Sequence, residues 1–67
     1  MGIKYAMEFT QTYNRELGLI ESRVYLNVLQ LTPSGRYNVV KKLDLGRADS
    51  EEEANQITDR YLYNISK

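Results

Sequence analysis

Residues 3–9 alternate between apolar and polar side chains, which is the pattern of a strand with one buried face. The apolar set is Ile3, Tyr5, Met7 and Phe9, and the opposite set is Lys4, Ala6 and Glu8. Tyr13 continues the apolar set, so the strand can run on toward Asn14, where Asn14, Arg15 and Gly18 supply loop-forming residues. The pattern therefore predicts a first strand that begins near residue 3.

Thr32-Pro33-Ser34-Gly35 is the clearest turn signal in the chain. Proline suits the second position of a type I turn, and the glycine after it accepts a positive φ. We therefore predict a hairpin tip here, followed by a strand over residues 36–45. One face of that strand is predicted to carry Tyr37, Val39, Leu43 and Leu45, with Lys41 as the single polar intrusion.

A C-terminal helix is predicted from about Ser50 to Ile65. Ser50 and Glu53 match a capping box, and the acidic residues around them favour the positive end of the helix dipole. Apolar residues recur at helical spacing and form one stripe, which is expected to lie on the sheet. The stripe consists of Ala54, Ile57, Tyr61, Leu62 and Ile65.

The segment from residue 14 to 31 fits two templates. Its apolar residues are spaced three or four apart, which is typical of a helix, but Val24, Tyr25 and Val28 favour a pleated surface. The hairpin tip that follows needs a strand on each side. We therefore predict a strand over residues 23–32, while residues 14–21 remain compatible with a helical turn.

Together these elements predict an α+β fold of the order β-β-β-α. Three strands form an antiparallel meander, and the C-terminal helix packs on one face of it. Residues 1–67 are expected to make a single small domain, whose core leaves a thin margin between burial and chain entropy.

Composition removes several classes of function. The chain has no cysteine and no histidine, which excludes disulfides and the usual zinc sites, and its glycines have no phosphate-binding spacing. Glu51, Glu52 and Glu53 are consecutive, so a helix fans them apart and they cannot converge on one proton or metal. We predict that the protein is not an enzyme, and we expect no catalytic residue, cofactor, metal or small-molecule ligand.

The net charge is zero, but the basic and acidic side chains are unevenly distributed along the chain. Residues 21–48 hold five basic side chains and two acidic ones, whereas residues 49–67 hold five acidic and two basic ones. The six tyrosines suggest base stacking, but Tyr5, Tyr37 and Tyr61 fall on predicted core faces. That leaves Tyr13, Tyr25 and Tyr63 as candidates for exposed positions.

The stretch "GRYNVVKKLDLGRADSEEEANQITDRY" runs from a hairpin through a Leu-Gly step into a capped helix with Glu-Glu-Ala. In this order it resembles the AP2-type and integrase arm-binding domains. The resemblance implies that the three-stranded sheet binds in the major groove of DNA. Candidate nucleic-acid contacts are then Arg23, Arg36 and Lys42. Zero net charge opposes this function, because phosphate binding needs a dense cationic surface.

Association with protein is the preferred prediction. The helix is expected to cover the face bearing Ile3, Tyr5, Met7, Phe9, Val24, Leu26, Val28, Val39, Leu43 and Leu45. The opposite face then presents an apolar patch of Tyr25, Leu29, Leu31 and Val40, and such patches usually mark interfaces. Alternatively, the strand over residues 23–32 is shifted in register, or the loop at residues 14–21 covers the patch.

The sequence thus predicts a small protein-binding module that self-associates through its sheet as a two-fold homodimer. DNA binding by the sheet is the alternative. A secretion signal and a stretch long enough to cross a bilayer are both lacking, so we expect a cytoplasmic protein without membrane contact. Its small size suits an accessory or inhibitory protein of a bacterium or phage.

Overall fold

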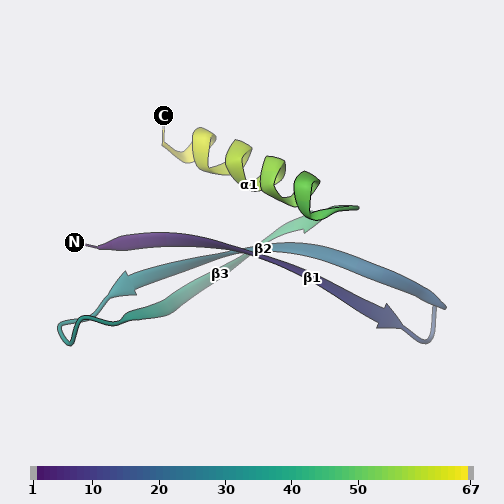
Figure 1. Ribbon diagram of the computed structural model, residues 1–67, viewed down its shortest axis with the longest axis horizontal. Helices are drawn as coiled ribbons and strands as arrows, with labels where there is room; N and C mark the ends of the chain where they lie inside the picture. The colour runs from purple at the N-terminus through teal and green to yellow at the C-terminus, as the bar shows by residue number, and fades with distance from the viewer. Residues whose placement is uncertain (1, 67) are drawn as a thin grey trace.

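The computed structural model describes residues 2–66, which form three antiparallel strands and one C-terminal helix (Figure 1). Strand β1 spans Ile3–Asn14, β2 Leu19–Leu31 and β3 Tyr37–Arg47, and helix α1 spans Glu51–Ile65. The strands pair in sequence order, β1-β2-β3, as an open meander. The predicted α+β fold of order β-β-β-α is confirmed.

The segment that fitted two templates forms a turn and a strand. Asn14 starts the turn: its carbonyl accepts from the Gly18 N–H at 2.8 Å, and its side-chain Oδ1 accepts from the Leu17 N–H at 3.1 Å. Gly18 has φ 64°, a conformation that costs glycine little because it lacks a Cβ. Strand β2 therefore begins at Leu19, earlier than predicted, and no helix forms between residues 14 and 31.

The second hairpin turns at Thr32-Pro33-Ser34-Gly35, as the sequence predicts. The Gly35 N–H donates to the Thr32 carbonyl at 2.9 Å, and the Thr32 N–H donates to the Arg36 carbonyl at 2.7 Å. Gly35 has φ 88°, so the glycine supplies the positive φ that the turn needs. Strands β2 and β3 leave this tip as a long hairpin.

Two register shifts interrupt the pairing of β2 with β3. Val28 pairs with Lys41 but Leu29 pairs with Val39, so Val40 is an extra residue in β3. In the same way Val24 pairs with Gly46 and Tyr25 with Asp44. Such bulges increase the twist of a sheet and change which side chains share a face.

Helix α1 begins where its cap predicts. The Ser50 side chain accepts from the Glu53 N–H at 3.2 Å, and Glu51, Glu52 and Glu53 occupy the first turn. Ala54 is fully buried against Val24 and Ala48. Met7, Phe9, Leu45 and Ile57 pack around this cluster. The core therefore lies between the first half of the helix and the middle of the sheet.

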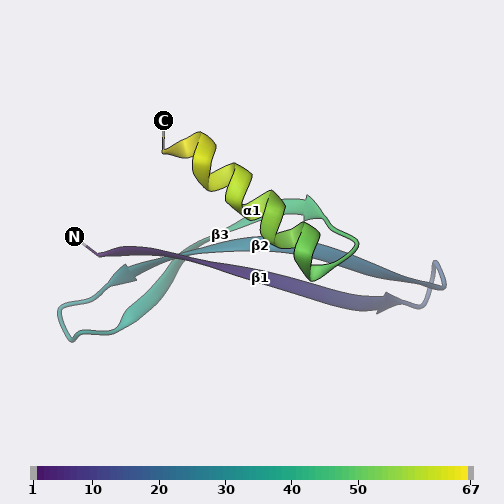
Figure 2. The same ribbon diagram turned by 45° about the horizontal axis from the view of Figure 1, so that its top comes forward.

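The helix covers only the middle of the sheet. Its N-terminal half lies over the strands, whereas its C-terminal end stands away from them (Figures 1 and 2). The two hairpins extend beyond the helix on both sides, and the molecule measures 45 × 28 × 15 Å. Its radius of gyration is 14.2 Å, whereas a compact chain of this length has about 11 Å.

The solvent-accessible surface area also shows that the molecule is more open than a compact protein of its size. The chain exposes 5302 Å², whereas a compact protein of 7.8 kDa exposes about 4,400 Å². The excess is about 900 Å². The side chains that contribute to it include large apolar ones at the ends of the hairpins, namely Ile3, Tyr5, Tyr13, Leu17, Leu19, Ile20, Leu31, Tyr37, Val39 and Val40.

Candidate protein interface on the open sheet face

The sheet face opposite the helix has a polar centre. The Glu8 side chain accepts from Asn27 Nδ2 at 3.1 Å, and its other oxygen lies 3.5 Å from Lys42 Nζ. Lys42 Nζ also lies 4.5 Å from the centre of the Tyr25 ring, which is a cation–π distance. The centre of this face is therefore held by polar contacts between neighbouring strands.

A second ion pair lies beside the first. Arg23 Nη2 donates to both Asp44 oxygens at 2.9 Å, and the Gly46 N–H donates to Asp44 Oδ1 at 2.9 Å. The Arg23 hydrogen bond, together with the Gly46 N–H, holds the pKa of Asp44 below its ordinary value. The hydrogen bond from Asn27 and the charge of Lys42 lower the pKa of Glu8 in the same way.

Because the pKa values of these two carboxylates are lowered, we expect the protein to lose stability in acid. A pKa that is lowered on folding means that the folded state favours the ionised carboxylate. Asp44 and Glu8 therefore stabilise the fold at pH values above their ordinary pKa values of 3.8 and 4.5. This stabilisation is lost as the pH falls through the lower folded-state values. Urea unfolding midpoints from neutral pH to about pH 2 measure this change.

Asp44→Asn separates the contribution of Asp44 from the rest of the titration. The amide oxygen still accepts from the Gly46 N–H but no longer carries the charge that pairs with Arg23. We expect a lower midpoint at neutral pH and a smaller further fall in acid. Equal falls in the variant and the unmodified protein would contradict a role for this ion pair.

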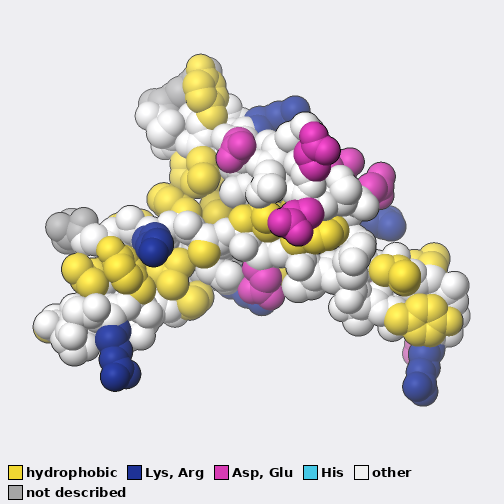
Figure 3. All heavy atoms as spheres, in the orientation of Figure 1, with side chains coloured by type: hydrophobic (Ala, Val, Ile, Leu, Met, Phe, Trp, Pro, Cys, Tyr) yellow, Lys and Arg dark blue, Asp and Glu magenta, His cyan; other side chains and the backbone are white. Residues whose placement is uncertain are grey.

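Toward the β2–β3 hairpin the same face becomes apolar. Leu29 pairs with Val39 and Leu31 with Tyr37, so these four side chains share the face opposite the helix. We call them the hairpin patch. Val39 is 57% exposed, and Tyr37 and Leu31 are each 43% exposed. Figure 3 shows apolar side chains gathered at this end of the molecule, with a basic side chain among them.

The bulge at Val40 corrects the sequence prediction on three residues. Val39 and Tyr37 were predicted to lie on the helix-covered face, but the pairing places them beside Leu29 and Leu31. Val40, a predicted interface residue, is the inserted residue of the bulge and is 56% exposed. An alternating pattern cannot reveal an inserted residue, because the insertion reverses the alternation, so side chains before and after it no longer share the face that a continuous pattern assigns to them.

The other predicted interface residues fall into two groups. Leu29 and Leu31 lie in the hairpin patch, whereas Tyr25 lies in the polar centre below Lys42.

The three candidate nucleic-acid contacts do not lie together in one surface. Arg23 and Lys42 are paired with carboxylates, and Arg36 lies exposed at the hairpin tip. The structure brings no dense cationic surface together from these three residues.

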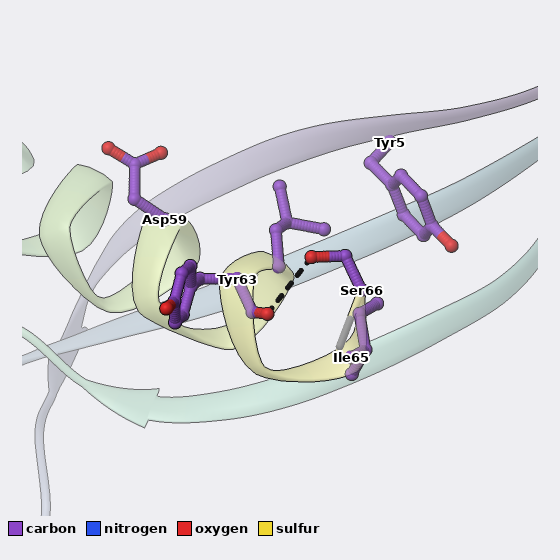
Figure 4. Close-up of a pocket in the computed structure, with 6 residues that line it drawn as sticks. Tyr5, Asp59, Tyr63, Ile65 and Ser66 are labelled. Atoms are coloured by element: carbon purple, nitrogen blue, oxygen red, sulfur yellow. Dashed lines mark hydrogen bonds between the residues drawn. The ribbon is translucent and has the colours of Figure 1, made fainter.

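A groove lies at the end of the sheet that carries the β2–β3 hairpin, on the side that faces the helix (Figure 4). It has a volume of about 530 Å³ and lies between β1 and the last turns of α1. We call it the helix-end groove; it is lined by Tyr5, Asp59, Leu62, Tyr63, Ile65 and Ser66. The Ser66 hydroxyl donates to the Tyr63 carbonyl at 2.9 Å and fixes the last turn beside it.

Sequence reasoning placed Tyr5, Leu62 and Ile65 in the core, but the groove leaves Tyr5 43% and Ile65 47% exposed. The helix stripe continues to Ile65, while the sheet twists away from beneath it. Helical periodicity reports which side of a helix is apolar, but it does not report where the covering sheet ends. The sequence therefore showed which side of the helix is apolar, but whether the last apolar residues are buried depended on the twist of the sheet.

Within residues 2–66 no group of acidic side chains is placed to hold a metal ion. Over the same range no helix is long and apolar enough to span a bilayer. No family model matches the sequence, and no curated protein or solved structure is significantly similar to it.

Proposed function

We propose that this chain is a non-enzymatic protein-binding module that self-associates through the hairpin patch. The observation that carries the proposal is an exposed apolar face on a molecule that is too open for its size. Four neighbouring apolar side chains, three of them at least 43% exposed, lie on one face of the hairpin. Contiguous patches of this kind mark interaction surfaces.

The surface area supports a second chain as the partner. The excess over a compact monomer is about 900 Å², and a stable interface buries about 800 Å² per partner. Small domains with few buried side chains commonly gain stability by association. Here the buried apolar side chains of the described residues are Val24, Leu26, Ala48 and Ala54. A cytoplasmic location, which the sequence predicts, is part of this proposal.

The test replaces the two most accessible aliphatic residues of the patch. In the double variant Leu31→Thr/Val39→Thr, called the patch variant, threonine keeps the preference for a strand but removes apolar contact. Because both side chains are exposed, we expect an intact fold and an association constant lowered more than roughly tenfold. Sedimentation velocity over a concentration series measures the association, and circular dichroism measures the fold.

Tyr13→Thr/Ile20→Thr is the matched control. These residues pair across β1 and β2 at the other end of the sheet, and each is 61% exposed. The control is expected to associate like the unmodified protein. An unmodified protein that remains monomeric at high micromolar concentration would overturn the proposal.

DNA binding remains the alternative, and a titration decides it. The ion pairs of Arg23 and Lys42 with carboxylates leave few cations for phosphates, so we expect no binding to mixed-sequence duplex DNA at low salt. Binding that is steeply sensitive to salt would instead favour the alternative.

A further inference from the structure

The charges around the hairpin patch have one sign. Lys4 Nζ lies 5.3 Å from the centre of the Tyr37 ring, and Arg36 directly precedes Tyr37 at the hairpin tip. Residues 2–7 and 28–43, which build this end of the sheet, include no aspartate or glutamate. A two-fold contact between two patches would bring these cations close to their own copies, which opposes association.

The helix-end groove has the opposite charge and a similar apolar content. Tyr5, Leu62 and Ile65 supply apolar surface, and Asp59 supplies a carboxylate at the rim. Glu52 lies seven residues before Asp59, so both carboxylates lie on the same side of the helix, two turns apart. In Figure 3 most of the acidic side chains lie over the helix, together with basic ones, away from the hairpin end.

We propose that the hairpin patch of one copy docks on the helix-end groove of a second copy, in a head-to-tail contact. This inference rests on the proposed self-association and names the surface that the patch meets. Apolar side chains meet apolar side chains, and the cations beside the patch approach the carboxylates of the helix. The uneven charge of a chain with zero net charge fits this pairing, because each copy carries both partners.

The positions of the two surfaces determine the type of assembly. Tyr5 of the groove pairs with Val28, and Lys4 beside the patch pairs with Leu29, so patch and groove lie on opposite faces of the same end of the sheet. A copy bound through its patch therefore still presents its own groove. Contacts of this kind are heterologous, and they produce rings or open rows instead of closed two-fold dimers.

The test mixes two variants, each defective in one surface. The patch variant, Leu31→Thr/Val39→Thr, keeps its groove. The groove variant, Asp59→Lys/Ile65→Gln, keeps its patch and changes two exposed side chains. Each variant alone is expected to remain monomeric, because every contact needs one patch and one groove. An equimolar mixture is expected to form heterodimers and nothing larger, which sedimentation equilibrium measures.

Other outcomes overturn the inference in distinguishable ways. If the groove variant alone associates as strongly as the unmodified protein, then patches meet patches: the head-to-tail contact is wrong and the proposed self-association stands. If the two variants do not associate when mixed, although both are folded by circular dichroism, the head-to-tail contact is also wrong. If the unmodified protein is monomeric, both proposals fail.

A single charge change provides a second test that leaves the apolar surfaces intact. Asp59→Lys is expected to weaken association more than roughly tenfold, because it places a cation opposite the basic hairpin. Asn64→Lys adds a cation on the opposite side of the helix and is expected to leave association unchanged. Added salt should weaken association of the unmodified protein, whereas a contact between two basic patches would strengthen with salt.

Discussion

Replacing Leu26 with alanine is expected to unfold most of the protein. Leu26 has no exposed surface and lies in the central strand, paired with Met7 on one side and Leu43 on the other. Truncating a fully buried leucine costs about 2–5 kcal/mol. A core of this size supplies at most about 3–5 kcal/mol in total. Thermal and urea unfolding followed by circular dichroism measure the loss.

Leu19→Ala is the control for that experiment. Leu19 lies in the same strand and is 43% exposed, so its truncation leaves no closed cavity and should cost less than about 1 kcal/mol. If both variants unfolded at the same urea concentration, the core would not lie between β2 and the helix.

Replacing Ala54 with leucine is expected to loosen the helix from the sheet. Ala54 has no exposed surface and lies against Val24 and Ala48, so a larger side chain must displace one of its neighbours. Overpacking of this kind costs about 1–3 kcal/mol. The helix is in contact with the sheet mainly through its first half, so the displacement acts where the two layers touch. Urea unfolding measures the cost.

The next residue provides the matched control. Asn55 is exposed and lies about 100° around the helix from Ala54, so Asn55→Leu introduces the same side chain without meeting the sheet. We expect the stability of this variant to stay within about 0.5 kcal/mol of the unmodified protein. If Ala54→Leu were equally stable, the contact between helix and sheet would have to be adaptable.

The local signals of the sequence were sufficient for the elements of the fold. Ser50 and Glu53 predicted the start of the helix, and the cap is formed between these residues. Pro33 and Gly35 predicted the second hairpin and, through it, resolved the ambiguous segment before it as a strand. These signals act within a few residues, so they do not depend on packing elsewhere in the molecule.

The candidate site was predicted only in part, because it depends on how the strands align. The outward-facing positions of Leu29 and Leu31 followed from alternation in one strand, although only Leu31 is exposed and Leu29 is half-buried. The contribution of Tyr37 and Val39 required the bulge at Val40, which no local pattern shows. The groove beside Tyr5 required the twist of the sheet, which separates the strands from the last turns of the helix.

The order of the strands also bears on how the chain reaches this structure. Each strand pairs only with its neighbour in sequence, and each hairpin closes through a short loop. Short loops lose little entropy when they close, and folds dominated by local contacts cross their folding barrier rapidly. The contacts that join the most distant parts of the sequence are those of helix α1 with strand β1. The hairpins are therefore free to form before the helix docks, and their apolar ends are available to a second copy from the start.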